Sequence, residues 1–232
     1  QGLHAFSRVE TPWGIRRLDE HGSWRLRPRR LQLDGFRRSG GDGNPWGIAF
    51  GNWGEPFVKG NGQGVFELLP GMVSTERIAS FWGREMTIGQ TPTKSMIIEF
   101  AESPHLPDDI QGEMLIAGYF ARDVNRFKRE IDGSGHRLSL QPNLLTSSHN
   151  AFRPVDIGIG PDGAIWISSW GREYGLTEQD GRQVNEGRIY RIWPKAAPPK
   201  LDADPKREKP IADWTLSELL QDLGSPLPVW RT

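Results

Sequence analysis

Short apolar bursts separated by turn residues run along most of the chain. Examples are GIRRL from Gly14, GIAF from Gly47, GEMLIAGYF from Gly112 and AIWISSW from Ala164. Short runs of this kind bounded by Gly, Pro, Asp or Asn are typical of β-strands joined by turns. IDGSGHRLSL and GPDGAIWIS predict hairpins, because Asp and Gly adopt the backbone conformations that tight turns need. No helical period intervenes before residue 210, so the pattern predicts an all-β antiparallel domain over about residues 5–195.

The strands carry recurrent Trp-Gly pairs. They stand at Trp13-Gly14, Trp46-Gly47, Trp53-Gly54, Trp82-Gly83 and Trp170-Gly171. A motif repeated across short strands is typical of propeller blades, each a small antiparallel sheet. The spacing of the pairs is loose, and a β-sandwich or a barrel also fits this pattern.

The C-terminal part of the chain has a different character. The segment 194–210, PKAAPPKLDADPKREKP, is rich in proline and charge and predicts an extended linker. We therefore divide the chain into a β domain over residues 1–193, this linker, and a helix with a tail over 211–232. The helix is expected over 215–223, because Thr215 and Glu218 form a capping-box pattern and Gly224 is followed by a proline.

Composition and charge narrow the classes of function. The chain has 232 residues and ten Trp, enough to fill a core, and no cysteine. Disulfides, thiolate metal sites, a Cys nucleophile and covalently attached c-type haem are thereby excluded. No apolar run approaches the ~20 residues that span a membrane. Lys plus Arg and Asp plus Glu both number 29, so no global charge favours nucleic acid.

The charges are unevenly distributed along the chain. Residues 1–38 hold nine Arg against four acidic residues, a net charge of +5 that the remainder balances. Arg25, Arg27, Arg29 and Arg30 are the densest part of this cluster. They are either a solvated strand face or a docking patch for a partner, and the sequence leaves both interpretations open.

The residues that could carry chemistry are few. GNGQG, from Gly60, resembles a phosphate-binding loop, but a strand-like VFELLP follows where such a loop needs a helix, so we predict a turn. The five histidines show no metal-ligand spacing. His105 and His149 precede strands and could line a pocket or make structural hydrogen bonds. The pair Asp108-Asp109 supplies too few oxygens for calcium.

Several blocks together resemble a known family. They are SRVETPWGIRRLD, NPWGIAFGNWG, HLPDDIQGEML, HNAFRPVDIGIGPDGAIWISSW and GRIYRIWPKAAPP. They are similar to the dehydrogenase-like β-propeller of planctomycete-type haem-binding proteins, within the glucose/sorbosone dehydrogenase-like group. The resemblance covers roughly residues 1–200 and implies an exported six-bladed propeller, of which this length corresponds to a partial ring of about three to four blades. WTLSELLQDLGSPLPVWRT resembles the start of the helical repeats that often follow it, before a cytochrome c domain.

The chain departs from that family at its polar positions. The family commonly has His and Asp where this chain has Ile48 and Gly51, and a Lys-His pair where it has Lys94-Ser95. It commonly has Asp at Ser169 and His at Glu186. General acid–base catalysis needs titratable groups held in a pocket, so these replacements predict loss of catalysis. We accordingly favour no catalytic residue and no cofactor.

Two functions follow as expectations. The first is a non-catalytic structural or docking subunit on the extracytoplasmic side, bound to other protein subunits, with a membrane electron-transfer or photosynthetic assembly as one setting. Its contact residues are then Arg25, Arg27, Arg29 and Arg30, together with Leu216, Leu220 and Leu223 on the helix.

The alternative that the resemblance implies is a periplasmic quinone-linked sugar dehydrogenase with pyrroloquinoline quinone and calcium. In that case His105, His149, Arg153 and Asp156 are its site residues. A fragment with no independent activity is a third interpretation.

Overall fold

The structure is a computed structural model. It describes residues 1–2, 6–37, 43–68, 85–172, 178–179, 182–183, 186–195 and 209–227. The Trp82-Gly83 pair and the greater part of the expected linker lie outside the described residues. The division of the chain into residues 1–193, 194–210 and 211–232 therefore stays a prediction.

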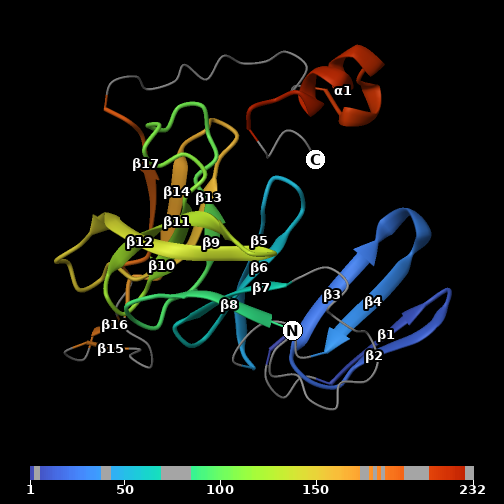
Figure 1. The fold of residues 1–232 in the computed structure, drawn as a ribbon, viewed down its shortest axis with the longest axis horizontal. Helices are drawn as coiled ribbons and strands as arrows, with labels where there is room; N and C mark the ends of the chain where they lie inside the picture. The colour runs from blue at the N-terminus through green and yellow to red at the C-terminus, as the bar shows by residue number, and fades with distance from the viewer. Residues whose placement is uncertain are drawn as a thin grey trace.

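Three antiparallel sheets, which we call blades I, II and III, form the body of the protein (Figure 1). Blade I consists of β5 (Pro45–Phe50), β6 (Pro56–Gly60), β7 (Gly64–Leu68) and β8 (Glu85–Gln90). Blade II consists of β9 (Ile98–Phe100), β10 (Met114–Gly118), β11 (Asp123–Asp132) and β12 (Gly135–Thr146). Blade III consists of β13 (Pro154–Ile159), β14 (Ile165–Ser169) and β17 (Arg188–Ile192), with the short pair β15 (Glu178–Gln179) and β16 (Arg182–Gln183) inserted before β17.

The blades are arranged as in a propeller. Each is an antiparallel sheet whose strands follow in chain order, with β15 and β16 inserted before the last strand of blade III, and the first strands β5, β9 and β13 lie side by side in that order. Sheets that follow one another around a set of parallel first strands are the arrangement of propeller blades. In the described part of the chain the arc does not close into a ring. The predicted all-β, antiparallel, partial propeller-like fold is confirmed.

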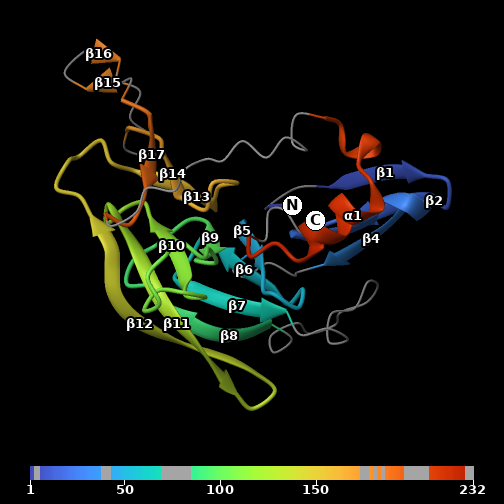
Figure 2. The same cartoon turned by 90° about the horizontal axis from the view of Figure 1, so that it is seen from above.

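Two hairpins precede the blades and lie to one side of them (Figure 2). They are β1 (Ser7–Thr11) with β2 (Gly14–Leu18), and β3 (Gly22–Arg27) with β4 (Gln32–Arg37). A 3-10 turn at Pro28–Arg30 joins β3 to β4. Among the residues of these strands whose burial is described, Leu18 and Gly22 are the buried ones, so the hairpins add little to the core.

The core has two layers, one on each face of blade II. Met114 and Ile116 of β10 point towards blade I and pack with residues such as Phe57 and Phe127. Leu115 and its alternate neighbours point towards blade III. Successive side chains of a strand face opposite sides, so an apolar run such as MLIA can fill both layers. Each large apolar side chain that is fully buried contributes about 1.5–3 kcal/mol relative to leaving it exposed.

Local predictions of turns and of the helix are confirmed. Gly133 and Gly163 have φ of +62° and +75° in the hairpin turns of blades II and III, a region that glycine adopts without strain. The GNGQG stretch connects β6 to β7 as a turn.

The C-terminal helix α1 (Leu216–Leu223) follows a short 3-10 turn at Ile211–Asp213 and begins with the expected capping box. Among the described residues, no helix has the length and hydropathy that crossing a membrane requires.

Candidate functional site

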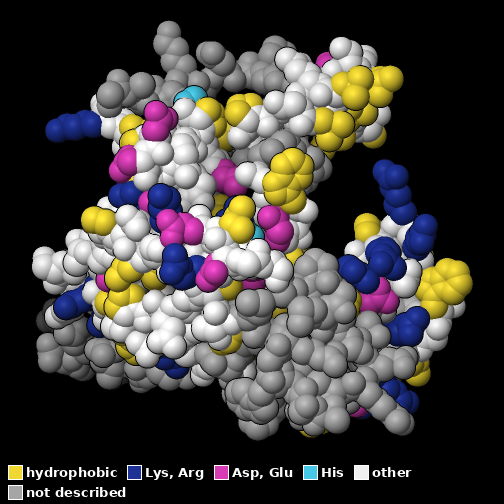
Figure 3. All heavy atoms as spheres, in the orientation of Figure 1, with side chains coloured by type: hydrophobic (Ala, Val, Ile, Leu, Met, Phe, Trp, Pro, Cys, Tyr) yellow, Lys and Arg dark blue, Asp and Glu magenta, His cyan; other side chains and the backbone are white. Residues whose placement is uncertain are grey.

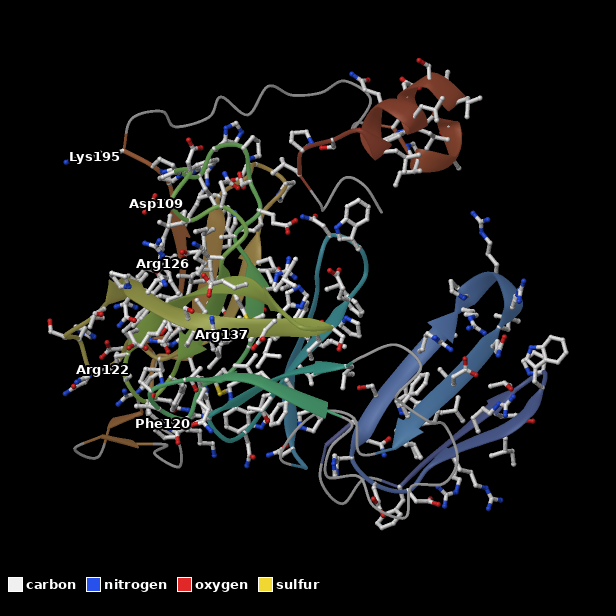
Figure 4. The ribbon with its side chains drawn as sticks, viewed as in Figure 1. Asp109, Phe120, Arg122, Arg126, Arg137 and Lys195 are labelled. Atoms are coloured by element: carbon white, nitrogen blue, oxygen red, sulfur yellow. The ribbon has the colours of Figure 1, made fainter. Side chains whose placement is uncertain are left out.

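The blades present two different ends. One end, which we call the acidic end, is formed by the loop 101–113 and the turn 160–163, and it carries Asp109, Glu113 and Asp162. The opposite end, which we call the aromatic end, is formed by the segment 91–97, the turn 119–122 and the loop 147–153, together with Trp170 after β14. Figure 4 shows the separation, since Asp109 and Arg126 lie towards one end and Phe120 and Arg122 towards the other.

The two candidate histidines lie at opposite ends. His105 is exposed at the acidic end, its ring centroid 5.9 Å from that of Trp193. His149 is exposed at the aromatic end, where its Nδ1 accepts a hydrogen bond of 3.2 Å from the Ala151 N–H. The structure therefore does not bring these two side chains together around one substrate.

The other two candidates of the dehydrogenase interpretation are also apart. Arg153 is buried at the aromatic end, where its guanidinium donates to the Tyr119 carbonyl at 3.4 Å and lies 5.6 Å from the Tyr119 ring centroid. Its backbone N–H donates to Ser169 Oγ at 2.8 Å. Asp156 is exposed on β13, and its Oδ1 accepts from the Ile157 N–H at 3.0 Å. The hydrogen bonds of Arg153 thus connect the turn after β10 to the start of β13.

Glu99 is a candidate that the sequence analysis missed. It lies on β9, and burial raises its pKa. A hydrogen bond from the Phe100 N–H opposes this rise, whereas the charges of Glu102 and Asp156 add to it. A carboxyl with a raised pKa is a candidate general acid or base. The signal in the sequence was the single Glu inside the apolar run MIIEF.

The positions at which the chain departs from the resembled family have structural roles here. Ser95 is fully buried and donates to Thr91 Oγ1 at 2.9 Å. Gly51 is buried beside two long side chains, and a Cβ there would lie 2.6 Å from Glu55 Oε2 and 2.9 Å from Arg129 Nη1. Ile48 is exposed. These residues pack or turn the chain and place no titratable group in a shared site.

The buried carboxylates at the acidic end are paired with arginines. Asp162 is buried and accepts from both Arg191 Nε and Arg191 Nη2 at 2.8 Å. Burial alone raises the pKa of Asp162, but hydrogen bonds from Trp166, the Ala164 N–H and Arg191 outweigh it and leave the pKa below its usual value.

Two further buried carboxylates are hydrogen-bonded, one at the acidic end and one between blades I and II. Glu113 accepts from Arg126 Nε at 2.6 Å. Glu67 of blade I contacts His136 of blade II through Nδ1 at 2.9 Å and through the backbone N–H at 3.0 Å.

Two cationic side chains at the aromatic end lie over the faces of tryptophan rings. Lys94 Nζ lies 4.6 Å from the Trp46 ring centroid, and the Arg172 guanidinium lies 4.8 Å from that of Trp170. Such contacts are attractive because the face of an aromatic ring carries negative potential.

The arginine cluster of the hairpins divides into two parts. Asp34 pairs with Arg25 at 3.1 Å and with Arg27 at 3.6 Å. Arg29 and Arg30 stand in the exposed turn Pro28–Arg30, and no described acidic side chain pairs with them. Figure 3 shows Lys and Arg side chains gathered over these hairpins. The assignment of Arg25, Arg27, Arg29 and Arg30 as contact residues stays a prediction, and within the described residues Asp34 pairs with the first two.

The leucines of α1 are exposed as a stripe. Leu216, Leu220 and Leu223 keep 71%, 58% and 62% of their surface accessible. The stripe is visible as apolar side chains over α1 in Figure 3. Leu227, beyond the helix, is buried beside the turn that contains Gly163 and attaches this segment to blade III.

No metal centre is evident in the part of the chain that the structure describes. No three His, Cys, Asp or Glu side chains within it are arranged to hold an ion.

Comparison with solved structures finds distant similarity. An oxidoreductase described as a glucose dehydrogenase, from Thermus thermophilus, is 19% identical, with a TM-score of 0.45 over 64% of this chain and 44% of its own. The soluble aldose sugar dehydrogenase of Escherichia coli is 14% identical, with a TM-score of 0.39 over 67% of this chain and 50% of its own. An inactive virginiamycin B lyase from Staphylococcus aureus, with quinupristin, is 15% identical, with a TM-score of 0.41 over 83% of this chain and 57% of its own.

This chain thus spans about half the length of each of these structures, and the low scores support no inference about activity. No curated protein matches the sequence. A family model does match, over residues 72–196, and it is described as a domain of unknown function, DUF7133. Because the match covers more than half of the chain, the protein belongs to the DUF7133 family.

Proposed function

We propose that this protein is a non-catalytic, extracytoplasmic docking subunit of a larger protein assembly. A membrane electron-transfer or photosynthetic complex is the setting we propose for it. The observation that carries the proposal is the surface formed by the tips of the two N-terminal hairpins. We call it the hairpin-tip surface, and it consists of Trp13, Leu26, Arg29, Arg30 and Leu31.

The two tips are held together. Trp13 Nε1 donates to the Arg30 carbonyl at 2.8 Å, which links the β1–β2 turn to the turn after β3. Trp13 nevertheless remains 65% exposed, and Leu31 remains 57% exposed. Leu31 has φ of +48°, and its N–H donates to the Pro28 carbonyl at 3.2 Å. A bulky residue in this conformation is unusual, and here the conformation presents its side chain to solvent.

The composition of the surface suits a protein partner. Trp and Arg are over-represented among residues that dominate binding energy, and contiguous exposed apolar groups mark interaction sites. Arg29 and Arg30 favour a partner with carboxylates, because a guanidinium pairs with a carboxylate in two places. The exposed leucine stripe of α1 supplies a second apolar contact. Salt should weaken the contribution of the arginines to the binding free energy and leave the contribution of the leucines largely unchanged.

The proposal is tested by purification of the tagged native protein from its source membranes and periplasm at low and high salt. The double variant R29E/R30E and the variant Trp13→Ala should lose a stoichiometric companion at low salt. Arg137→Glu is the matched control, because Arg137 is an exposed arginine on β12 that pairs with Glu130. A monomer without a stable companion at either salt, or equal loss in the control, contradicts the docking function.

A sugar dehydrogenase is the second candidate, and one observation favours it. Glu99 and Asp156 lie on the neighbouring first strands β9 and β13, with the pKa of Glu99 raised by burial and by the charges of Glu102 and Asp156. Turnover of aldoses with an artificial electron acceptor and added quinone, abolished in Glu99→Gln, would establish this function. We expect no turnover, and we expect His149→Ala to behave as the unmodified protein does.

A further inference from the structure

A row of rings and cations crosses the aromatic end. We call it the aromatic row, and its members are Trp46, Lys94, Phe120, Tyr119, Trp170 and Arg172. Lys94 Nζ lies 4.6 Å from the Trp46 ring centroid and 5.9 Å from that of Phe120. The Phe120 and Tyr119 ring centroids are 4.9 Å apart, and those of Tyr119 and Trp170 are 6.1 Å apart.

The aromatic row spans all three blades. Trp46 belongs to β5 of blade I, Lys94 to the connection between blades I and II, and Phe120 to the turn after β10 of blade II. Trp170 and Arg172 follow β14 of blade III. The row is therefore an extended feature of the assembled fold and not a local cluster on one loop.

Two cations of this end, Lys94 and Arg172, have no acidic partner within the described residues. Neither Lys94 nor Arg172 forms an ion pair there, and the neighbouring Arg122 contacts only the Asn150 side chain and backbone groups. Asp123 is buried below the turn, and burial raises its pKa against hydrogen bonds from Asn125 and Asn143. Among the described acidic residues, Glu186 is exposed, and its backbone lies against Gly171.

The rings are also accessible from outside. Phe120 remains 42% exposed and Trp170 remains 40% exposed. A ligand that fits this surface needs several negative charges, spaced to reach Lys94 at one side and Arg172 at the other. It also needs apolar groups between those charges to cover the rings.

We propose that the aromatic row binds an acidic segment of a partner protein, rich in Asp and Glu with apolar residues between them. Carboxylates pair with the ammonium and guanidinium groups, and leucine or aromatic side chains cover Phe120 and Trp170. Trp, Tyr and Arg are the residues most enriched at such contacts. This surface is separate from the hairpin-tip surface, and neither proposal depends on the other.

The experiment measures binding of a fluorescent peptide of alternating Glu and Leu by anisotropy, with a Gln–Leu peptide as the uncharged control. We expect saturable binding of the Glu peptide alone. Lys94→Glu and Arg172→Glu should each weaken it about tenfold, the size of effect expected for residues that dominate an interface. Trp170→Ala should weaken binding at high salt as well, because covering a ring does not depend on ionic screening.

Controls locate the binding and exclude other ligands. Arg137→Glu and R29E/R30E should bind the peptide as the unmodified protein does, and the milder Lys94→Gln and Arg172→Gln should reproduce the loss if a charge reversal disturbs folding. Equal loss in Arg137→Glu, or no saturable binding of the Glu peptide, overturns the proposal. Binding of phosphatidylglycerol vesicles or heparin through Lys94 and Arg172, with none of the peptide, also overturns it.

Discussion

The charged side chains at the two ends of the blades have different contacts. At the acidic end the charged groups form the pairs Asp162–Arg191 and Glu113–Arg126, each with a buried carboxylate. At the aromatic end Lys94 and Arg172 lie against aromatic rings without an acidic partner in the described residues.

A buried carboxylate is costly unless paired and hydrogen-bonded, so we interpret the acidic end as structural. A cation on an exposed ring remains available to an external carboxylate. We therefore expect substitutions at the acidic end to change stability and substitutions at the aromatic end to change binding.

Asp162→Ala is expected to have the largest effect. It removes both contacts to Arg191 together with the hydrogen bonds from the Ala164 N–H and Trp166 Nε1. Breaking a buried charge network should lower the free energy of unfolding by about 2–4 kcal/mol, measured by urea denaturation.

The control is Asp109→Ala, because Asp109 is 71% exposed and pairs with Arg126 at 3.5 Å. Its effect should stay within about 1 kcal/mol. Equal losses in the two variants would contradict the structural interpretation of the buried network.

Gly118→Ala tests the support of the turn 119–122. A Cβ at Gly118 would lie 1.8 Å from Asp123 Oδ1, so the buried carboxylate must move. Overpacking of this kind costs about 1–3 kcal/mol. Binding of the acidic peptide should weaken too, since the turn carries Phe120. Gly158→Ala is the matched control, because no atom lies within 4 Å of the added Cβ. Comparable destabilisation of the two variants, read by thermal unfolding, would argue against this packing.

The pH dependence of stability should distinguish Glu99 from Asp162. The folded protein holds the Glu99 proton to higher pH than the unfolded chain, whose pKa is near 4.5, so this group makes stability fall as pH rises from about 4.5 through the raised pKa. Asp162 has a lowered pKa and acts oppositely, because its contribution is lost as pH falls below about 3.8 through the lowered value.

We therefore expect opposite changes in the dependence of the unfolding free energy on pH. Glu99→Gln should reduce the loss of stability above about pH 4.5, and Asp162→Asn should reduce the loss below about pH 3.8. Asp108→Asn, at an exposed position, should leave the profile unchanged. A profile for Glu99→Gln that matches the unmodified protein would remove Glu99 as a buried titrating group.

Several strands were not expected from the sequence, and the reason is the same in each case. PFVKG (β6) and QLDGFR (β4) have no regular alternation and contain Gly or charged residues. They are strands because a neighbouring strand pairs with them. Lys59 shows how far context overrides composition, since it is fully buried on β6 and its Nζ donates to the Gly60 carbonyl at 2.9 Å.

The candidate site shows the same limit. His105 and His149 have similar surroundings in the sequence, each before a strand with apolar residues. Which end of a blade a loop occupies depends on strand direction and on the order of the blades, and neither is encoded within the loop. Burial of Glu99 likewise depends on β13 lying beside β9.

The sequence by itself determined the features that local interactions create. The hairpin turns at Gly133 and Gly163 follow from backbone freedom, and α1 follows from the reciprocal bonds of Thr215 and Glu218. Only the tertiary structure decided that Asp162 pairs with Arg191 at one end of the blades and that Lys94 and Arg172 lie over rings at the other. That outcome depends on strands far apart in the sequence, because Asp162 meets Arg191 across β14 and β17, and Lys94 meets Trp46 and Phe120 where two blades adjoin.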